Sequence, residues 1–349
     1  MAPADPLVSV ITPVFNGAAY LQQCIQSVLA QSFENFEYFI VDNCSTDESL
    51  AIAKQAAAAD SRIRVIQCDQ HVGPIQNWNR SLRHIDRNSD YVKFVHADDW
   101  IFPECITEMV KVVEENPSVG VVGAYGLRGA RVVWQGLPYP STVTAGHEIC
   151  RLRLLGKVPY VLGSPTSVLF RSDLVRKSRA FFNGHPFPQF MDQEVCYQIL
   201  QNSDFGFVHQ VLTFSRVHEQ SVTSLLDTRL NQDLPAKLNI LLKYGQIYLP
   251  NEAYQRRVKC LMNRYYRFLG GHIFRFSENR FREYHRNILK HWGCPLSLVK
   301  LTKGSLLELL DLLVTPKRLA IKAVHLTARV LHWVSRSTSS KSSHVQRRT

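Results

Sequence analysis

Short apolar runs and amphipathic segments alternate along the first 125 residues of the chain. The apolar runs are near-continuous, which predicts buried strands, and they lie at residues 8–14, 36–41, 62–68, 91–95 and 119–124. The segments between them have apolar positions at helical spacing, which predicts helices at residues 20–31, 49–59, 73–85 and 103–115. Ser45 and Glu48 are spaced as a capping box before the second of these helices. The alternation favours a parallel sheet covered by helices on both faces.

Short polar side chains follow the predicted strands where each strand ends. Asn16 follows the first strand, Asp42 the second, Asp69 the third, and the adjacent pair Asp98 and Asp99 the fourth. The carboxyl ends of parallel strands meet at one edge of a sheet, and ligands bind there. Two adjacent aspartates repel each other unless a cation lies between them, so a divalent metal such as Mn²⁺ or Mg²⁺ is the simplest occupant. An acidic pair can also be a plain turn or helix cap, but the shared edge favours a binding site.

Charge is distributed unevenly along the chain. Residues 251–349 contain 20 Lys and Arg against 5 Asp and Glu, whereas residues 1–250 contain 21 against 24. This asymmetry predicts an anionic partner for the C-terminal third, either a membrane surface or a nucleic acid. We expect no nucleic acid, because this region has neither a recognisable nucleic-acid-binding motif nor regularly spaced stacking aromatics.

The eight cysteines are widely spaced, and no CxxC pair occurs. This spacing favours reduced core residues over a zinc site or a disulfide framework. The N-terminus lacks a basic start and its apolar run is interrupted by Pro13, which argues against a signal peptide. No apolar run approaches the ~18–20 residues of a membrane-spanning helix. We therefore expect a cytoplasmic protein, peripheral at most on the inner face of a membrane.

Three stretches in this order resemble the nucleotide-sugar-binding half of family 2 glycosyltransferases: VSVITPVFNGAAYLQQCIQSVLAQSFENFEYFIVDNCSTDES, HVGPIQNWNRSL and YVKFVHADDWIFPE. The resemblance extends over residues 7–220. It implies the GT-A fold, an α/β architecture with a doubly wound, Rossmann-like and mostly parallel sheet. It also implies metal-assisted transfer of a sugar from a UDP- or dTDP-sugar, with inversion, to a glycan or lipid-linked acceptor of the cell envelope.

The resemblance assigns roles to the first loops. Pro13, Phe15 and Asn16 fall in the loop that forms a wall beside the base and phosphates. Asp42 matches the acidic residue that recognises the nucleobase. Cys44 departs from the family pattern, because glycine is usual there.

The resemblance places four further residues around the nucleotide. Asp69 and Asn79 fall where the family packs around the base and ribose. Asp98 and Asp99 fall on the metal-binding motif, where the metal bridges the two phosphates, so Asp98 is also expected beside the donor. His96 replaces the first aspartate of the usual D-x-D-D form, and we expect it to shape the edge of the site rather than to bind the metal.

The later motifs supply the expected base and phosphate ligands. In FPQFMDQEVCYQIL, at residues 187–200, Asp192 matches the catalytic carboxylate and Glu194 is the alternative. An inverting displacement needs such a base to remove the proton of the acceptor hydroxyl. In SRVHEQSVTS, the resemblance implies that Arg216 neutralises phosphate and that His218 is a third metal ligand or a phosphate donor.

Each assignment has a purely structural alternative. Pro13 can terminate a strand, and Asp42 can form a turn. Asn79 can be a hydrogen-bonding core residue, and Asp192 can cap a helix. A lone histidine such as His218 usually has a structural role.

The predicted organisation has three parts. We expect a catalytic domain at residues 1–225, a helical region at 226–335 that is able to associate with a membrane, and a polar, disordered tail at 336–349. Helices are predicted at residues 250–276, 278–291 and 305–334, the last with a basic amphipathic pattern typical of interfacial helices.

Two alternative functions stay open. One is a transferase that charges polyprenyl phosphate directly. The other is a non-catalytic sugar-nucleotide-binding protein with a basic tail that binds nucleic acid. The presence of Asp98, Asp99 and Asp192 together favours an active enzyme.

Overall fold

The protein is described by a computed structural model. It describes residues 6–159, 161–178, 181–183, 190–218, 230 and 232–314. The chain forms two compact units, which meet in sequence between Arg257 and Val258. The predicted boundary at residue 225 lies outside the described residues.

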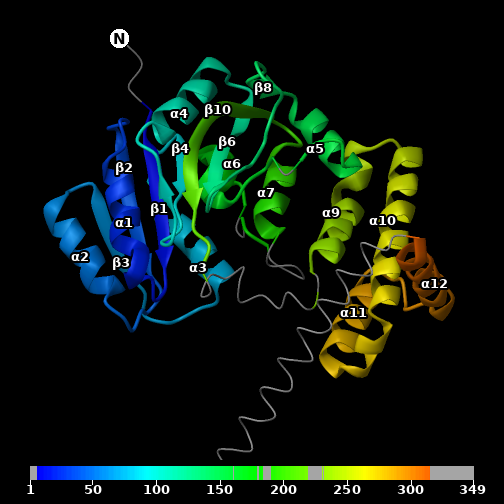
Figure 1. Cartoon of the computed structure of the whole chain (residues 1–349). Coiled ribbons are helices and arrows are strands. Elements are labelled where there is room, and N and C mark those ends of the chain that lie inside the picture. The colour runs from blue at the N-terminus through cyan, green and yellow to red at the C-terminus, as the bar shows by residue number, and fades with distance from the viewer. Residues whose placement is uncertain are drawn as a thin grey trace, which may run out of the picture. The chain divides into compact units, whose positions relative to one another are not determined.

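The first unit contains a ten-stranded sheet with the order β3-β2-β1-β4-β9-β6-β10-β5, while β7 pairs with β6 and β8 with β10 (Figure 1). The strands are β1 (Val8–Val14), β2 (Phe36–Asp42), β3 (Ile63–Gln67), β4 (Tyr91–Phe94), β5 (Trp100–Ile101), β6 (Val119–Arg128), β7 (Arg131–Val133), β8 (Val143–Thr144), β9 (Val168–Arg171) and β10 (Asp204–Ser215).

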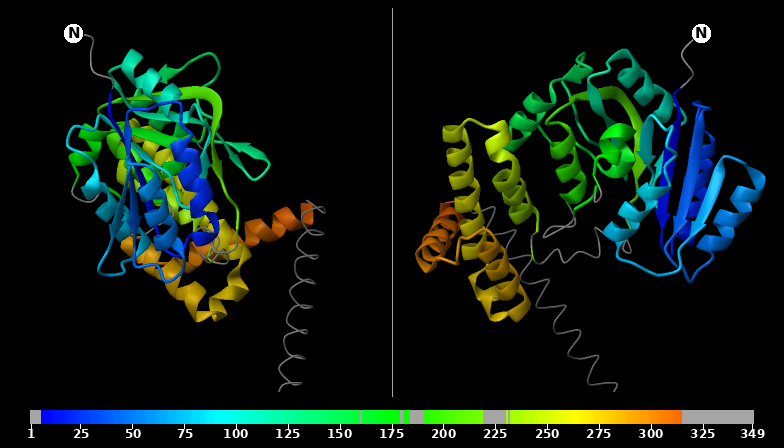
Figure 2. Two further views of the ribbon diagram at one scale, coloured as in Figure 1. Left: turned by 90° about the vertical axis from the view of Figure 1, so that its left-hand side faces the viewer. Right: turned by 180° about the vertical axis from the view of Figure 1, so that it is seen from behind.

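The four strands β3, β2, β1 and β4 run parallel, as predicted (Figure 2). Val14 pairs with Asp42, and Asp42 pairs with Gln67, so these carboxyl ends are level with one another. The predicted, mostly parallel sheet is confirmed, and β9 is an exception within it, because β9 enters between β4 and β6 and runs antiparallel to both. No separate pattern marks β9 in the sequence, since this strand is short and falls in the less regular second half.

Helices in the first unit are α1 (Ala18–Leu29), α2 (Ser49–Ala59), α3 (Pro74–Ser81), α4 (Cys105–Glu115), α5 (Gly146–Leu155), α6 (Ser172–Arg176), α7 (Met191–Ile199), α9 (Asp233–Tyr248) and the first part of α10 (Asn251–Gly271). Two 3₁₀ turns, η1 (Leu82–His84) and η2 (Pro165–Ser167), also belong to it.

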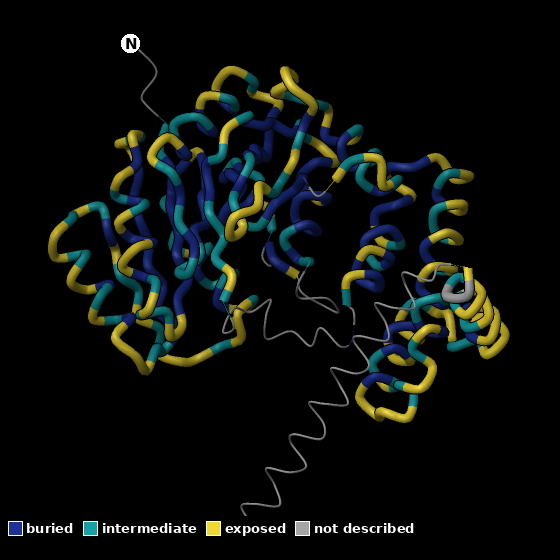
Figure 3. Tube along the Cα trace, in the orientation of Figure 1, coloured by how far each residue is buried: buried dark blue, intermediate teal, exposed yellow. Residues whose placement is uncertain are grey.

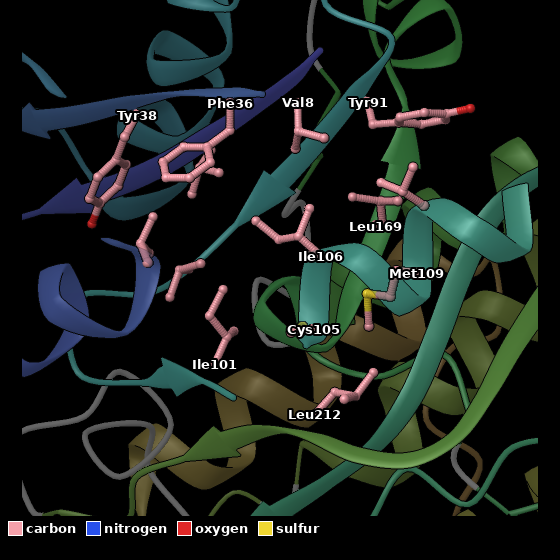
Figure 4. Close-up of a cluster of buried hydrophobic side chains, with 14 of the residues drawn as sticks. Val8, Phe36, Tyr38, Tyr91, Ile101, Cys105, Ile106, Met109, Leu169 and Leu212 are labelled. Carbon is pink, nitrogen blue, oxygen red and sulfur yellow. The ribbon is translucent and has the colours of Figure 1, made fainter. Parts of the chain in front are cut away.

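A single apolar core joins β1, β2 and β4 to helices α1 and α4 (Figure 4). Val8 and Tyr38 contribute from the strands, and Ile106 and Met109 from α4. Burial of this kind is the main stabilising term for such a domain, and it holds the strand ends of the sheet rigidly.

The predicted capping box of Ser45 and Glu48 was wrong. Helix α2 begins at Ser49, whose N–H donates to Asp47 Oδ1 at 3.0 Å. Ser45 Oγ instead accepts the Asn16 N–H at 3.0 Å. A contact with a distant loop therefore replaces the local cap.

Helix α9 lies within the region predicted to be helical, residues 226–335, but no separate helix was predicted there, and α9 belongs to the first unit. It is anchored on α7, because Lys243 forms an ion pair with Glu194 and the Tyr248 hydroxyl donates to the Tyr197 carbonyl. This placement depends on tertiary contacts rather than on a strong local pattern.

The second unit is helical in its described part. It contains the remainder of α10, the 3₁₀ helix η5 (Ile273–Ser277), α11 (Asn279–His291) and α12 (Leu298–Val314). The helix predicted at residues 278–291 is confirmed by α11. The segment predicted at 305–334 overlaps α12 as far as residue 314, and the remainder, with the predicted tail, lies outside the described residues.

Candidate active site

The loop after β1 is tied to the loop after β2. Asn16 has a left-handed backbone (φ 51°), and its Oδ1 accepts the Thr46 N–H at 2.8 Å. The Asn16 N–H donates to Ser45 Oγ at 3.0 Å. These bonds hold both loops together at the carboxyl edge of the sheet, where the sequence analysis expected them to meet.

The residues before Asn16 differ in exposure. Pro13 is buried within β1, in register with Val41. Phe15 is 48% exposed, and its ring centroid lies 4.3 Å from that of His71, in the loop after β3. The end of β1 therefore presents an accessible aromatic face, which is suited to stacking on a flat ligand.

Asp42 lies at the end of β2 and is only 1% exposed. Its Oδ2 accepts the Ser45 N–H at 3.2 Å. Its Oδ1 is buried and has no hydrogen-bond partner within the described part of the chain. Because a buried polar oxygen without a partner is unfavourable, this atom is suited to accept a hydrogen bond from a ligand N–H.

Cys44 has the backbone conformation that explains why glycine is usual at this position. Its φ is +61°, in the left-handed region that glycine adopts without strain. The thiol compensates in part, since its Sγ donates to the Cys68 carbonyl at 3.0 Å. The loop geometry is therefore kept despite the substitution.

Arg80, on α3, is a residue that the sequence analysis did not single out. Its Nη2 donates to Asn43 Oδ1 at 2.7 Å and to Asn77 Oδ1 at 2.8 Å, and its Nη1 donates to the Gln70 carbonyl at 2.9 Å. Arg80 thus braces the residue next to Asp42. No local pattern marks this arginine as part of the site, because Asn43, the residue that it braces, lies 37 residues away in sequence.

Asp69 and Asn79 were predicted beside the base and ribose. Asp69 is exposed in the loop after β3. Asn79 holds Phe182, because its Nδ2 donates to the Phe182 carbonyl at 2.7 Å and its Oδ1 accepts the Phe182 N–H at 2.9 Å. Asn79 therefore anchors residues 181–183 to α3, and the nucleotide contacts of both residues stay predictions.

Three possible metal ligands gather after β4. One nitrogen of His96 and one oxygen each of Asp98 and Asp99 lie within 4.8 Å of one another. The described residues therefore offer a compact donor set at the edge where the loops after β1 and β2 meet. Carboxylate oxygens suit Mg²⁺ and Mn²⁺, and an imidazole nitrogen is compatible with Mn²⁺.

Asp99 is buried and held in a fixed orientation. Its Oδ2 accepts the Thr166 hydroxyl at 2.8 Å, and its Oδ1 accepts the Arg216 N–H at 3.0 Å. Burial, and then the charge of Asp98, raise the pKa of Asp99 to about 7. A cation at this position would favour the ionised form and offset both effects, so the donor set fits a divalent metal.

His96 is more available for ligation than the sequence analysis expected. Burial lowers the pKa of His96, which favours the neutral imidazole. Its Nδ1 lies 3.9 Å from Asp99 Oδ2, and its buried Nε2 has no hydrogen-bond partner among the described residues. The ring packs against Trp78 at 4.6 Å between centroids. A neutral imidazole can bind a metal.

Arg216 follows β10 and crosses over the acidic pair. Its Nε donates to the Asp98 carbonyl at 3.0 Å and its Nη2 donates to Gln23 Oε1 at 2.6 Å. The guanidinium also lies over the Tyr20 ring, 4.3 Å from its centroid. These contacts orient the acidic pair, and the predicted contact of Arg216 with phosphate stays a prediction.

His218 lies beside Asp98, as the motif order suggested. Its Nε2 is 2.9 Å from Asp98 Oδ2, and its ring centroid lies 4.9 Å from that of Tyr20. The structure thus brings His218 to the acidic pair, although the two are 120 residues apart in sequence.

Lys93 and Thr166 support the acidic pair from beneath. The Lys93 ammonium is fully buried in β4 and donates to the Thr166 carbonyl at 2.6 Å and to the Val168 carbonyl at 3.2 Å. Thr166 Oγ1 in turn accepts the His96 N–H at 3.2 Å and donates to Asp99. Neither residue was predicted from the sequence, although a lysine inside an apolar strand is a visible signal for Lys93.

Asp192 and Glu194 lie in the first turn of α7. Glu194 is buried, forms an ion pair with Lys243, and accepts the Tyr244 hydroxyl at 3.4 Å. Asp192 is partly exposed, and its Oδ1 accepts the Gln193 N–H at 2.8 Å. Glu194 thus has an evident structural role, which favours Asp192 as the candidate base.

Similarity to known proteins shows which family the chain belongs to. The family model described as Glycosyl transferase family 2 matches residues 9–174. "Putative glycosyltransferase EpsE" of Bacillus subtilis (strain 168) is 30% identical over 228 residues, which cover 61% of this chain and 79% of that protein. The chain belongs to glycosyl transferase family 2. This glycosyltransferase is also similar to the "Putative teichuronic acid biosynthesis glycosyltransferase TuaG" of Bacillus subtilis (strain 168). The two are 39% identical over 94 residues, which cover 27% of this chain and 36% of TuaG.

Solved structures support the GT-A fold of this glycosyltransferase. The structure of S. aureus TarS 1-349 in complex with UDP-GlcNAc superimposes on this chain with a TM-score of 0.55 and 19% identity, and the match covers 75% of this chain and 73% of the TarS chain. The structure of the mannosyltransferase PcManGT from Pyrobaculum calidifontis, in complex with GDP-Man and Mn²⁺, superimposes with a TM-score of 0.51 and 15% identity, and the match covers 72% of this chain and 68% of the PcManGT chain. At these identities the likeness concerns the fold.

Among the described helices of this glycosyltransferase, none has the length and apolar character needed to cross a membrane.

Proposed function

We propose that this glycosyltransferase moves a sugar from a UDP- or dTDP-sugar to a glycan or lipid-linked acceptor, with inversion and with the help of Mn²⁺ or Mg²⁺. The observation that carries the proposal is the cluster of His96, Asp98 and Asp99 at the edge of the sheet. The UDP-GlcNAc complex of TarS supports a uridine nucleotide as the donor.

Asp98, Asp99 and His218 would hold the metal, with His96 in reach of the same position. A divalent cation supplies charge neutralisation for the diphosphate leaving group. Thr166 and Arg216 fix the Asp99 carboxylate in place, so this part of the site is organised in advance. The Mn²⁺ complex of the mannosyltransferase supports metal use.

The nucleotide would lie along the loops after β1 and β2. The unpartnered Oδ1 of Asp42 would accept a hydrogen bond from a base N–H. Phe15 would pack against the base or the ribose, since its ring is accessible. Asn16, Asp69, Asn79 and the guanidinium of Arg216 are proposed to complete the donor site, as the family resemblance implies.

Asp192 is proposed to be the general base. An inverting displacement needs one carboxylate that accepts the proton of the acceptor hydroxyl while the new glycosidic bond forms. Asp192 is partly exposed, whereas Glu194 is buried in an ion pair with Lys243, and this difference in accessibility supports Asp192 for the role.

The acceptor class is proposed to be a cell-envelope or surface polysaccharide, or its lipid-linked precursor, at the cytoplasmic side of a membrane. The similarity to a protein named for teichuronic acid biosynthesis supports this choice. The excess of basic residues after residue 250 supports an anionic membrane surface as a partner. Direct transfer to polyprenyl phosphate is the alternative within the same chemistry.

A panel of nucleotide sugars tests the proposal. The protein is mixed with each UDP-, dTDP- and GDP-sugar, with Mn²⁺ or with chelator, and donor hydrolysis and thermal stabilisation are measured. We expect one uridine or thymidine donor to stabilise the protein and to be hydrolysed slowly in a metal-dependent manner. Activity that is undiminished in excess chelator would overturn the metal assignment, and a response to GDP-sugars alone would overturn the nucleotide assignment.

A further inference from the structure

Helix α12 packs on α10 through its smallest residues. A Cβ added at Gly304 would overlap the backbone carbonyl of Tyr266, and one added at Gly270 would overlap the backbone of Ser305. The two helices therefore cross at glycines, with their backbones in close contact. Any rotation of α12 about its axis would bring a larger side chain into this crossing.

Ion pairs fix the same face of α12. Arg267 on α10 lies 2.9 Å from Glu308 and 2.7 Å from Asp311. Leu301 is buried in line with Gly304 and Glu308, since residues three and four apart share one side of a helix. The face of α12 that is turned inward is thus largely small and charged.

The outward face of α12 is apolar, which reverses the usual arrangement of a surface helix. Seven large apolar residues of the helix are at least 45% exposed: Leu298, Val299, Leu306, Leu307, Leu309, Leu310 and Val314. In Figure 3 this helix is drawn largely in yellow, the colour of exposed residues. Clustered exposure of this kind marks an interaction surface rather than a solvated one.

The charge of the second unit selects the partner. Residues 258–314 contain ten Lys and Arg and four Asp and Glu. Three of these four acidic residues form ion pairs with arginines of the same unit, and they are Glu278, Glu308 and Asp311. Lys300 and Lys303 are exposed on α12 itself. An anionic surface with an apolar interior complements this pattern, whereas a second copy would bring two basic units together.

We propose that α12 lies in the interface of an anionic lipid bilayer, with its leucines in the acyl region and its lysines at the headgroups. The proposal rests on the membrane partner of the proposed function and deepens it, because it assigns attachment to one helix face. Basic charge alone would give only weak, salt-sensitive attraction, and the leucine face supplies the apolar contribution.

Vesicle binding by the full chain tests the proposal. Co-sedimentation is measured with vesicles of phosphatidylcholine and phosphatidylglycerol, and with phosphatidylcholine alone. We expect the unsubstituted protein to bind the anionic vesicles. The partition coefficient of the Leu306→Gln/Leu310→Gln variant should fall by more than about tenfold, because each methylene buried in the bilayer contributes to the free energy of binding. Lys303→Gln should weaken binding to anionic vesicles less, and mainly at low salt.

Val132→Gln is the matched control, since Val132 is an exposed apolar residue of β7 in the first unit. It should bind vesicles like the unsubstituted protein. Equal binding by the double-leucine variant would overturn the proposal. So would loss of a dimer in that variant, which would make the face a contact between copies, or a large fall in its melting temperature, which would mean that the chain itself covers the leucines.

Donor binding separates this inference from the proposed function. The double-leucine variant should be stabilised by metal and nucleotide to the same extent as the unsubstituted protein. Vesicle binding without any response to donors would contradict the proposed function and leave the proposal for α12 intact. A normal donor response without vesicle binding would contradict the proposal for α12 and leave the proposed function intact.

Discussion

Asp192 and Glu194 illustrate how two carboxylates of one helical turn differ in their surroundings. Glu194 is buried against Lys243 and Tyr244, whereas Asp192 is partly exposed. A general base must come within hydrogen-bonding reach of the acceptor hydroxyl, and a partly exposed carboxylate is more accessible than a buried one. The assignment of Asp192 as the base therefore makes a clear prediction.

Asp192→Asn keeps the size of the side chain and removes its basicity. Transfer should fall by roughly 10²–10⁴-fold, the usual contribution of a general base, and donor affinity should stay unchanged. The measurement is the single-turnover rate at saturating donor, together with the donor Kd from calorimetry.

Glu194→Gln is the matched comparison in the same turn. It should lower the melting temperature, because Lys243 loses its partner, and it should change the transfer rate little. If the two variants exchange these effects, Glu194 is the base. If neither changes transfer, the base lies elsewhere in the chain.

Asp42→Ala separates donor recognition from chemistry. A charge-assisted hydrogen bond to a base N–H contributes about 1.5–3 kcal/mol, so the Kd for UDP in the presence of Mn²⁺ should rise roughly 10- to 100-fold. The turnover number at saturating donor should change less. Isothermal titration checks the first value and steady-state kinetics the second.

Asp60→Ala is the control for this variant, since Asp60 precedes β3 and so lies at the opposite edge of the sheet. It should leave UDP affinity unchanged. Unchanged affinity in Asp42→Ala, with a large loss of turnover, would contradict the role given to Asp42.

At the scale of elements, the 3₁₀ turn η2 connects the middle of the sheet to the acidic pair. Lys93 on β4 holds the carbonyls of Thr166 and Val168, and the Thr166 hydroxyl holds Asp99. Burial lowers the pKa of Lys93, and its hydrogen bonds to two carbonyl oxygens oppose this effect, because they favour the charged form. The turn thus supports the proposed metal site and is more than a simple connection.

Thr166→Val preserves the shape of the side chain and removes the hydroxyl. Affinity for Mn²⁺ should fall about 10–100-fold, the usual effect of losing a hydrogen bond to a metal ligand. Electron paramagnetic resonance of free Mn²⁺ during a titration measures this directly. Ser167→Ala in the same turn should have no such effect, and equal losses in both variants would point to the backbone of the turn instead of the hydroxyl.

At the scale of the whole molecule, every residue of the candidate site belongs to the first unit. Ligands that bind only the folded state stabilise it, by about 2.7 kcal/mol at a concentration of 100 Kd. UDP with Mn²⁺ should therefore raise the melting temperature of the first unit and leave a separate transition of the helical second unit unmoved. Differential scanning calorimetry, with and without chelator, checks this.

Asp99→Asn provides the internal control, because it removes a proposed metal ligand and leaves the strand before it intact. Its melting temperature should not respond to UDP with Mn²⁺. A full response in this variant would show that the nucleotide binds without the acidic pair.

The sequence by itself determined the parallel half of the sheet and the edge at which the site lies. Apolar runs specify buried strands, and the strands of such a sheet bring Asn16, Asp42 and Asp98 to one edge whatever the surrounding detail. Motif order then indicated His218, which the structure brings within hydrogen-bonding distance of Asp98.

The tertiary structure alone decided the features that depend on contacts between distant segments. The antiparallel entry of β9 and the support of Asp99 by Thr166 join residues far apart in sequence, and no local periodicity encodes such a contact. The same holds for α12, where the sequence shows an amphipathic helix but not which face is buried. The crossing at Gly304 and the ion pairs of Arg267 turn its acidic side inward and most of its leucines outward.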